Sequence, residues 1–195
     1  MESTHQSLLD LFLELQALDR IPRMGYSMRG MADPESVSEH SFHLSTLAWG
    51  LSMSLPELDR LRVLELALVH DLPEVRTGDL PRTVSRYLPR EVKAAAERAV
   101  AAELLAPLGD HGPALLDEYQ AAETPEARFV SVCDKLQLLI KVAAYEHWGA
   151  GGLGEFGEAL DRFDDGGFEP VRRLVDELRT WRRDHGLDQR PGAPI

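Results

Sequence analysis

Apolar side chains recur every three or four positions along most of this chain, which is the pattern of amphipathic helices. The first such segment covers residues 4–18 and the most apolar one covers 58–72. Further helices are predicted over 89–106 and 169–185, and another begins at Pro125. No stretch alternates apolar and polar residues between turn signals, so no strand is predicted. The pattern therefore predicts an all-α fold of about six to eight helices.

Helix starts are marked by polar side chains at fixed spacing. Ser36 and Glu39 have the spacing of a capping box, and Ser54 with Glu57 marks the start of the apolar helix over 58–72. Proline is favoured in the first turn of a helix, where its missing N–H costs nothing, and Pro125 therefore supports a helix start there.

One stretch, residues 70–81, combines a histidine with three acidic residues at the end of the most apolar helix. His70 and Asp71 are delivered to its inner end, where a buried carboxylate needs a cation, a hydrogen-bond donor or a metal. A neighbouring imidazole favours a divalent metal. Pro73 ends or kinks the helix, so Glu74 is expected in a turn near the ion but more mobile. On its own, the His-Asp pair is weak evidence for a metal, and a capped helix end is the better interpretation until other helices supply further ligands.

Other helices carry further candidate ligands. His40 and His43 lie in the first turns of the helix that begins near Ser36, and either could be a ligand or a surface histidine. Asp134 sits next to the apolar side of the helix that begins at Pro125. Its carboxylate either reaches into a site or is a solvated rim group beside a lysine.

Two sequence features have ordinary structural interpretations. Arg20 and Arg23 follow the first helix, where cations are favoured by the helix dipole. The segment 149–154 matches G-x-G-x-x-G, but it follows a helix, whereas the dinucleotide fingerprint follows a strand. A glycine-rich linker is the better interpretation.

Composition narrows the range of functions. The 195 residues carry a net charge of −12, which argues against a nucleic-acid partner bound through its phosphate backbone. Cys133 is the single cysteine, so no intramolecular disulfide can form and a reducing, cytoplasmic location is expected. No stretch approaches the roughly 20 apolar residues of a membrane span, so no membrane partner is expected.

His40, the pair His70-Asp71 and Asp134, each on a separate helix, resemble the ligand pattern of HD-domain metal-dependent phosphohydrolases. The flanking sequences resemble the 5′-deoxynucleotidase group of that superfamily. They are Arg20-Ile-Pro-Arg, Pro34-Glu-Ser-Val-Ser-Glu-His40, Leu68-Val-His70-Asp71-x-x-Glu74, Thr77-Gly78-Asp79, Phe129-Val-x-x-x-Asp134-Lys135 and Tyr145-Glu146.

The resemblance implies a fold and an assembly. Residues 1–195 would form one α-helical HD domain, with a metal-binding core over about 36–148. A C-terminal helix over about 169–185 and a frayed tail over 187–195 would follow. Members of the group are often homodimers.

The resemblance also implies roles for individual residues. His40, His70, Asp71 and Asp134 would bind a divalent cation, Mn²⁺, Co²⁺ or similar, with Zn²⁺, Fe²⁺ and Mg²⁺ as other candidates. Glu74 and Asp79 would act on the water and the leaving group, and Arg20 would orient the phosphate. The substrate contacts would also include His40, Asp134, Asp79, Ile21 and the pocket-lining residues Leu80, Pro81 and Arg82.

The implied reaction is hydrolysis of a 2′-deoxyribonucleoside 5′-monophosphate to nucleoside and phosphate. Some members carry Trp where this chain has Ile21, so sugar or base contacts of that Trp do not carry over. His43 matches no family ligand and is interpreted as a surface residue. Two alternatives remain open: an HD phosphohydrolase for a triphosphate, cyclic nucleotide or alarmone, and a metal-stabilised helical scaffold without turnover.

Overall fold

The computed structural model describes residues 7–187, in which eight helices have eight or more residues. They are α1 (Leu8–Leu15), α3 (Val37–Ser52), α4 (Arg60–Val69), α6 (Arg90–Leu104), α7 (His111–Ala121), α8 (Pro125–His147), α9 (Gly154–Asp161) and α10 (Glu169–Asp184). Single turns form α2 (Met24–Ser27) and α5 (Glu74–Thr77), and three 3-10 helices cover Gln16–Arg20, Arg82–Arg86 and Ala106–Leu108. These residues form no strand, which confirms the predicted all-α class.

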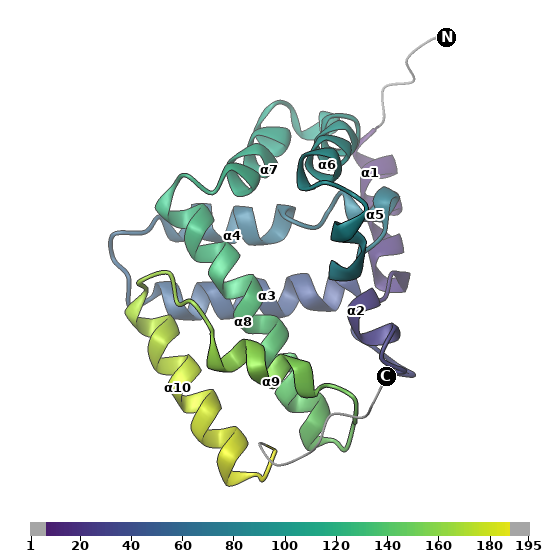
Figure 1. Ribbon diagram of the computed structural model, residues 1–195. Coiled ribbons are helices and arrows are strands. Elements are labelled where there is room, and N and C mark those ends of the chain that lie inside the picture. Colours follow the sequence, from purple (N-terminus) through teal and green to yellow (C-terminus); the bar gives the residue numbers. More distant parts are fainter. Residues whose placement is uncertain (1–6, 188–195) are drawn as a thin grey trace.

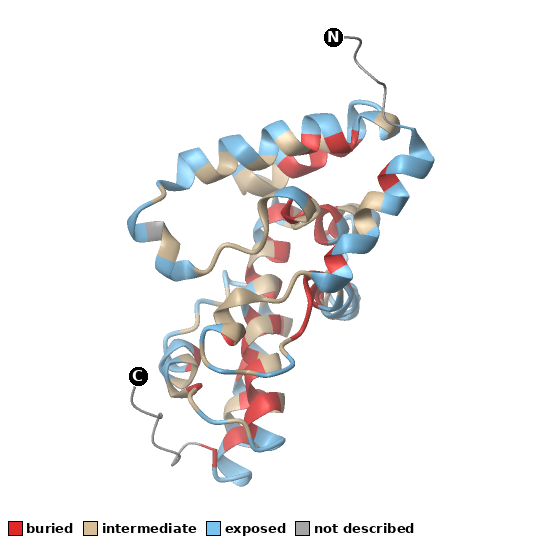
Figure 2. Cartoon of the chain, turned by 90° about the vertical axis from the view of Figure 1, so that its right-hand side faces the viewer, coloured by how far each residue is buried: buried red, intermediate tan, exposed pale blue. Residues whose placement is uncertain are grey.

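The longest helix, α8, runs through the middle of the molecule (Figure 1). Helices α3 and α4 pack against each other and against α8, and α7 packs on both α4 and α8. Helices α9 and α10 cover the later part of α8. Buried residues gather where these helices face one another, while their outer faces are exposed (Figure 2). Leu44, Leu66, Phe129 and Leu136 are among the fully buried side chains of this core.

Most predicted helix starts are confirmed. Ser36 caps α3 in a complete capping box with Glu39, and the Thr124 hydroxyl caps α8. The predicted cap of α4 is wrong. Its N-cap is Asp59, whose carboxylate accepts hydrogen bonds from two backbone N–H groups. Ser54 lies too early in the chain to cap α4, in the turns that follow α3.

The stretch 70–81 folds as a pair of turns. Helix α4 ends at Val69, and Pro73 then precedes α5, in which Glu74 is the first residue. Gly78 ends α5 with a φ of +70°, a conformation that glycine adopts without steric cost. These two turns bring Asp71, near the start of the stretch, and Asp79, near its end, within reach of one side chain, that of Arg23.

The C-terminal third differs most from the prediction. Helix α9 was not predicted, because Gly154 and Gly157 lower helix propensity. The C-terminal helix is confirmed as α10. The tail was predicted to begin at residue 187, but Leu187 is buried and its N–H donates to the Arg182 carbonyl. Residues 188–195 of that tail lie outside the described residues. Within residues 7–187, every helix is too short or too polar to cross a membrane.

Candidate metal centre

Three helices bring the four predicted ligands together. His40 comes from the first turns of α3, His70 and Asp71 follow α4, and Asp134 comes from α8. The Nε2 atoms of His40 and His70 are 3.3 Å apart. Asp71 Oδ2 lies 3.1 Å from His70 Nε2, and Asp134 Oδ1 lies 3.1 Å from His40 Nε2. Ligand atoms of His40, His70 and Asp71 all lie within 4.8 Å of one another.

Hydrogen bonds on the far side of each imidazole fix which nitrogen faces the centre. His70 Nδ1 lies 2.8 Å from the carbonyl oxygen of Ala67, and His40 Nδ1 lies 2.6 Å from Gln137 Oε1. Because an oxygen of this kind only accepts, each Nδ1 donates its hydrogen and each neutral ring presents the Nε2 lone pair inward. Two such lone pairs beside a carboxylate can hold a cation between them. Imidazole nitrogen with carboxylate oxygen fits divalent first-row metals.

The side chains at the centre favour one another's charged forms, although burial opposes them. Burial opposes the charged form of Asp71, but His70, Arg23 and His40 hold its pKa far below the usual range. Burial also opposes a charged His70, and Asp71 nevertheless raises its pKa. Burial likewise opposes the charge of Asp134, yet His40, whose Nε2 lies 3.1 Å from Asp134 Oδ1, keeps its pKa lowered. The carboxylates are therefore ionised and ready to bind a cation.

Glu74 lies next to this group and is strongly destabilised as a carboxylate. It is 2% exposed, and Oε2 has no hydrogen-bond partner among the described residues. Arg23 Nη1 is 3.9 Å from Oε2, and Lys93 Nζ from α6 is 4.0 Å from Oε1. Burial, together with Asp71 and Asp79, raises the pKa of Glu74 to about 10. The expected mobile position is wrong, because α5 begins at Glu74 and buries its side chain.

Arg23 is a functional residue that sequence reasoning missed. Its Nη1 donates to Asp71 Oδ2 at 3.1 Å and to Asp79 Oδ1 at 2.8 Å, and the Met24 N–H donates to Asp79 Oδ2 at 2.7 Å. Arg20, which was assigned to the phosphate, is exposed at the end of a 3-10 helix and makes no ion pair with another described residue.

Backbone pairing explains why the second arginine reaches the centre. The Arg23 N–H donates to the Glu35 carbonyl at 2.9 Å, and the Val37 N–H donates to the Ile21 carbonyl at 2.9 Å. This holds the extended segment after Pro22 against the start of α3. Such pairing between separate segments leaves no signal in the local pattern around Arg20 and Arg23.

A cavity of about 600 Å³ opens beside Arg23 and Asp79. The predicted pocket residues Leu80, Pro81 and Arg82 line it. Lys135 adds a cation, and apolar side chains complete the wall: Tyr26, Leu138, Leu139, Phe156 and Phe163. Ile21 does not line the described cavity. A cavity lined by arginines, a lysine and aromatic side chains suits an anionic head attached to a ring system.

Comparisons with known proteins agree with this geometry. The model of an HD domain family matches residues 15–157. The chain is 31% identical over 148 residues to 5′-deoxynucleotidase HDDC2 of Xenopus laevis, covering 74% of this chain and 72% of that protein. It is 30% identical over 139 residues to 5′-deoxynucleotidase hdd1 of Schizosaccharomyces pombe, covering 68% and 69%.

Solved structures show the same fold. A conserved hypothetical protein from Pyrococcus furiosus superposes with a TM-score of 0.76 at 33% identity, covering 88% of this chain and 99% of that one. A predicted metal-dependent phosphohydrolase from Magnetospirillum magnetotacticum superposes with a TM-score of 0.67 at 24% identity, covering 91% and 92%. At that lower identity the likeness concerns the fold alone.

Proposed function

The chain belongs to the HD domain family, and from this premise we propose that it is a metal-dependent phosphohydrolase of 2′-deoxyribonucleoside 5′-monophosphates. One observation carries the proposal: the inward lone pairs of His40 and His70 meet the Asp71 carboxylate beside a cavity that Arg23, Arg82 and Lys135 help to line. Relatives about 30% identical that bear the name 5′-deoxynucleotidase support the substrate class.

The ligand set is His40, His70 and Asp71, with Asp134 as the proposed fourth member. When bound, a divalent ion such as Mn²⁺ or Co²⁺ neutralises charge on the phosphoryl oxygens and lowers the pKa of a bound water. Four protein ligands leave positions open on a six-coordinate ion. The proposed domain, one HD domain over residues 1–195, extends beyond the matched range of 15–157.

The remaining polar groups divide the chemistry. Glu74 orients the attacking water and takes its proton, because α5 holds its carboxyl at the site and Oε2 has no hydrogen-bond partner among the described residues. Asp79 acts at the leaving-group side, where it borders the cavity. Arg23 binds the phosphate in the planar manner of a guanidinium, and Arg20 is proposed to orient the phosphate from outside. The nucleoside lies along Leu80, Pro81 and Arg82.

Phosphate release from dAMP, dGMP and dTMP with Mn²⁺ or Co²⁺ tests the reaction. AMP, dATP and a cyclic nucleotide serve as the competing substrates, and EDTA serves as the metal-free control. Release from the deoxyribonucleoside monophosphates that EDTA abolishes supports the proposal. Turnover of the triphosphate or cyclic ester alone assigns the protein to another HD phosphohydrolase, and absence of turnover with a bound ion leaves a scaffold.

A homodimer is proposed through the α3–α4 face. An apolar groove of about 420 Å³ lies there, and the Phe42 and Leu68 side chains at its rim are 66% and 54% exposed. Leu68 was expected in the core, so this exposure is itself a correction. Trp49 adds to the same groove. Sedimentation velocity on Phe42→Asp should give a monomer where the wild type gives a dimer.

A cytoplasmic location is kept as a proposal from the buried, unpaired Cys133.

A further inference from the structure

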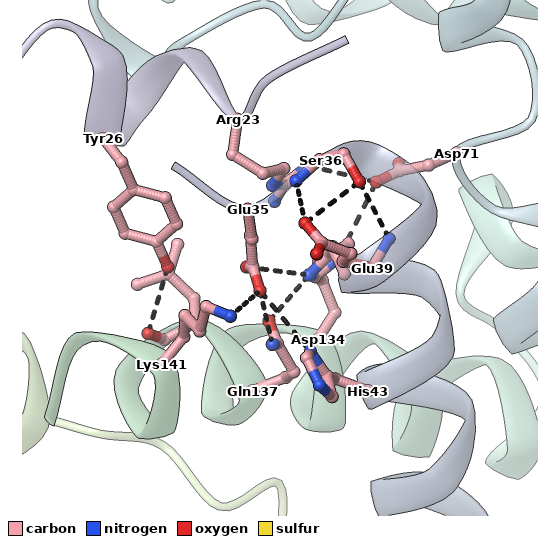
Figure 3. A network of polar contacts seen from close by, with 12 residues as sticks. Arg23, Tyr26, Glu35, Ser36, Glu39, His43, Asp71, Asp134, Gln137 and Lys141 are labelled. Carbon is pink, nitrogen blue, oxygen red and sulfur yellow. Dashed lines mark hydrogen bonds and ion pairs between the residues drawn. The ribbon is translucent and has the colours of Figure 1, made fainter. Parts of the chain in front are cut away.

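Glu35, just before α3, is a buried carboxylate behind the proposed ligand His40; its Oε1 lies 3.8 Å from His40 Nδ1, and the Gln137 amide bridges the two side chains (Figure 3). Its side chain is 0% exposed. Gln137 Nε2 donates to Glu35 Oε2 at 3.3 Å, and Gln137 Oε1 accepts from His40 Nδ1 at 2.6 Å. The three side chains therefore form a chain of hydrogen bonds that ends on the proposed ligand His40.

Helix periodicity explains how α8 supplies this connection. Asp134, Gln137, Lys141 and Tyr145 follow one another at spacings of three and four, so they lie along one stripe of the helix. The first is a proposed ligand, and the second contacts His40. Lys141 Nζ lies 3.3 Å from Glu35 Oε2, and the Tyr145 hydroxyl accepts from the Glu35 N–H at 2.7 Å. One stripe thus holds Glu35 at three points.

Glu35 Oε2 lies 3.3 Å from Lys141 Nζ and 3.3 Å from Gln137 Nε2, and this pairing sets the orientation of the Gln137 amide. A carboxylate accepts hydrogen bonds and cannot donate, so the amide must turn its NH₂ toward Glu35. Its oxygen then faces His40 Nδ1, which must carry the hydrogen. A flipped amide would place oxygen against the carboxylate and NH₂ against the N–H of the ring. Only one orientation of the Gln137 amide therefore satisfies both Glu35 and His40. In that orientation His40 Nε2 keeps its lone pair for a cation.

We propose that Glu35 and Gln137 are positioning residues that fix the tautomer and ring orientation of His40 for metal binding. The inference rests on the proposed metal centre. Lys141 neutralises the buried charge, so that the carboxylate is retained at full burial. Removing a hydrogen-bond partner of this kind from a metal-binding histidine usually weakens metal binding by 10- to 100-fold.

Titration calorimetry of the full chain with Mn²⁺ and Zn²⁺ tests the proposal without reference to turnover. Gln137→Met keeps the length of the side chain and removes both hydrogen bonds, so its Kd should rise about 10- to 100-fold. Glu35→Gln should also raise the Kd, because either amide orientation then becomes possible. Glu39→Gln is the matched control, since Glu39 belongs to the same segment but its side-chain hydrogen bonds within residues 7–187 go to the capping residue Ser36.

A second measurement reports the tautomer directly. In the Zn²⁺-loaded wild type, ¹⁵N–¹H correlation spectra should show the His40 hydrogen on Nδ1, in slow exchange with water. The same resonance should exchange faster in Gln137→Met. If Gln137→Met does not fold, as judged by its melting curve, the Kd and spectrum of Glu35→Gln decide.

Two results in the variants overturn the proposal. One is unchanged Kd and unchanged His40 resonances in both variants, and the other is an equal loss of affinity in Glu39→Gln. A wild type that binds neither ion overturns it together with the metal centre. A wild type that binds the ion but releases no phosphate overturns the proposed reaction alone, because the affinity differences still hold.

Discussion

Replacing Glu74 by glutamine should stabilise the metal-free protein at neutral pH. Its carboxyl has a pKa of about 10 in the folded chain and an ordinary value of 4.5, with burial as the main cause. Between these two values the unfolded chain loses the proton and the folded chain keeps it. Stability is therefore full below pH 4.5 and falls as the pH rises toward 10. From pH 4.5 to 7 the loss amounts to roughly 3 kcal/mol at most, at 1.36 kcal/mol per unit.

Urea denaturation in EDTA at pH 5 and at pH 8 measures this effect. The free energy of unfolding of Glu74→Gln minus that of wild type should increase by up to about 4 kcal/mol between the two pH values, at 1.36 kcal/mol per pH unit. The subtraction removes titrations shared by both proteins. Glu158→Gln, at a carboxyl that is 75% exposed, is the control and should show no such increase. An equal difference at pH 5 and pH 8 would refute the reasoning about burial.

The same variant should lose activity while it gains stability. With Mn²⁺ bound, Glu74→Gln should lower kcat by roughly 10²- to 10⁴-fold, the usual size of a general acid–base contribution. Its metal content should stay near that of wild type, as measured by elemental analysis. Loss of the ion would instead identify Glu74 as a ligand.

Three further predictions concern the ion, the phosphate and the sugar. Asp71→Ala should abolish both metal binding and phosphate release, and full activity of this variant after EDTA treatment would contradict the metal centre. Arg23→Ala should lower kcat/KM more than Arg20→Ala, because Arg23 contacts Asp71 and Asp79 whereas Arg20 is exposed; steady-state kinetics with dAMP measures both. The ratio of kcat/KM for dAMP over AMP should be about 5 to 150, the effect of a buried unpaired 2′-hydroxyl costing roughly 1–3 kcal/mol, and equal values would remove the deoxy preference.

The sequence predicted most of the long helices and the side chains that are proposed as ligands. Helical spacing predicts which side of α8 is apolar, and Asp134 lies beside that side. The apolar run that ends at His70 predicts a buried position for this histidine, and His70 is 4% exposed. The convergence of His40 with these residues came from the resemblance, since no local pattern states which helices touch.

Contacts between segments distant along the chain explain what sequence reasoning missed. Arg23 was interpreted as a helix-end cation, but it reaches Asp71, 48 positions away. Gln137 and Glu35 are 102 positions apart, and neither had a local signal. Glu74 was placed in a mobile turn because Pro73 was interpreted only as a helix stop, whereas proline also precedes the new helix α5. Each error concerns a polar side chain whose partner comes from another part of the chain.

Helix α8 links the stability of the core to the geometry of the site. Cys133 and Leu136 are buried in the core, and Asp134 and Gln137, the residues that follow each of them, contact His40. Successive residues on a helix point about 100° apart, so the same turn that packs the core also aims the ligand and its support. A small rotation of α8 would therefore misplace both polar groups at once. Two buried carboxyl groups, Glu35 and Glu74, would be better solvated if they were exposed to water. The close packing that resists such a rotation also keeps them buried.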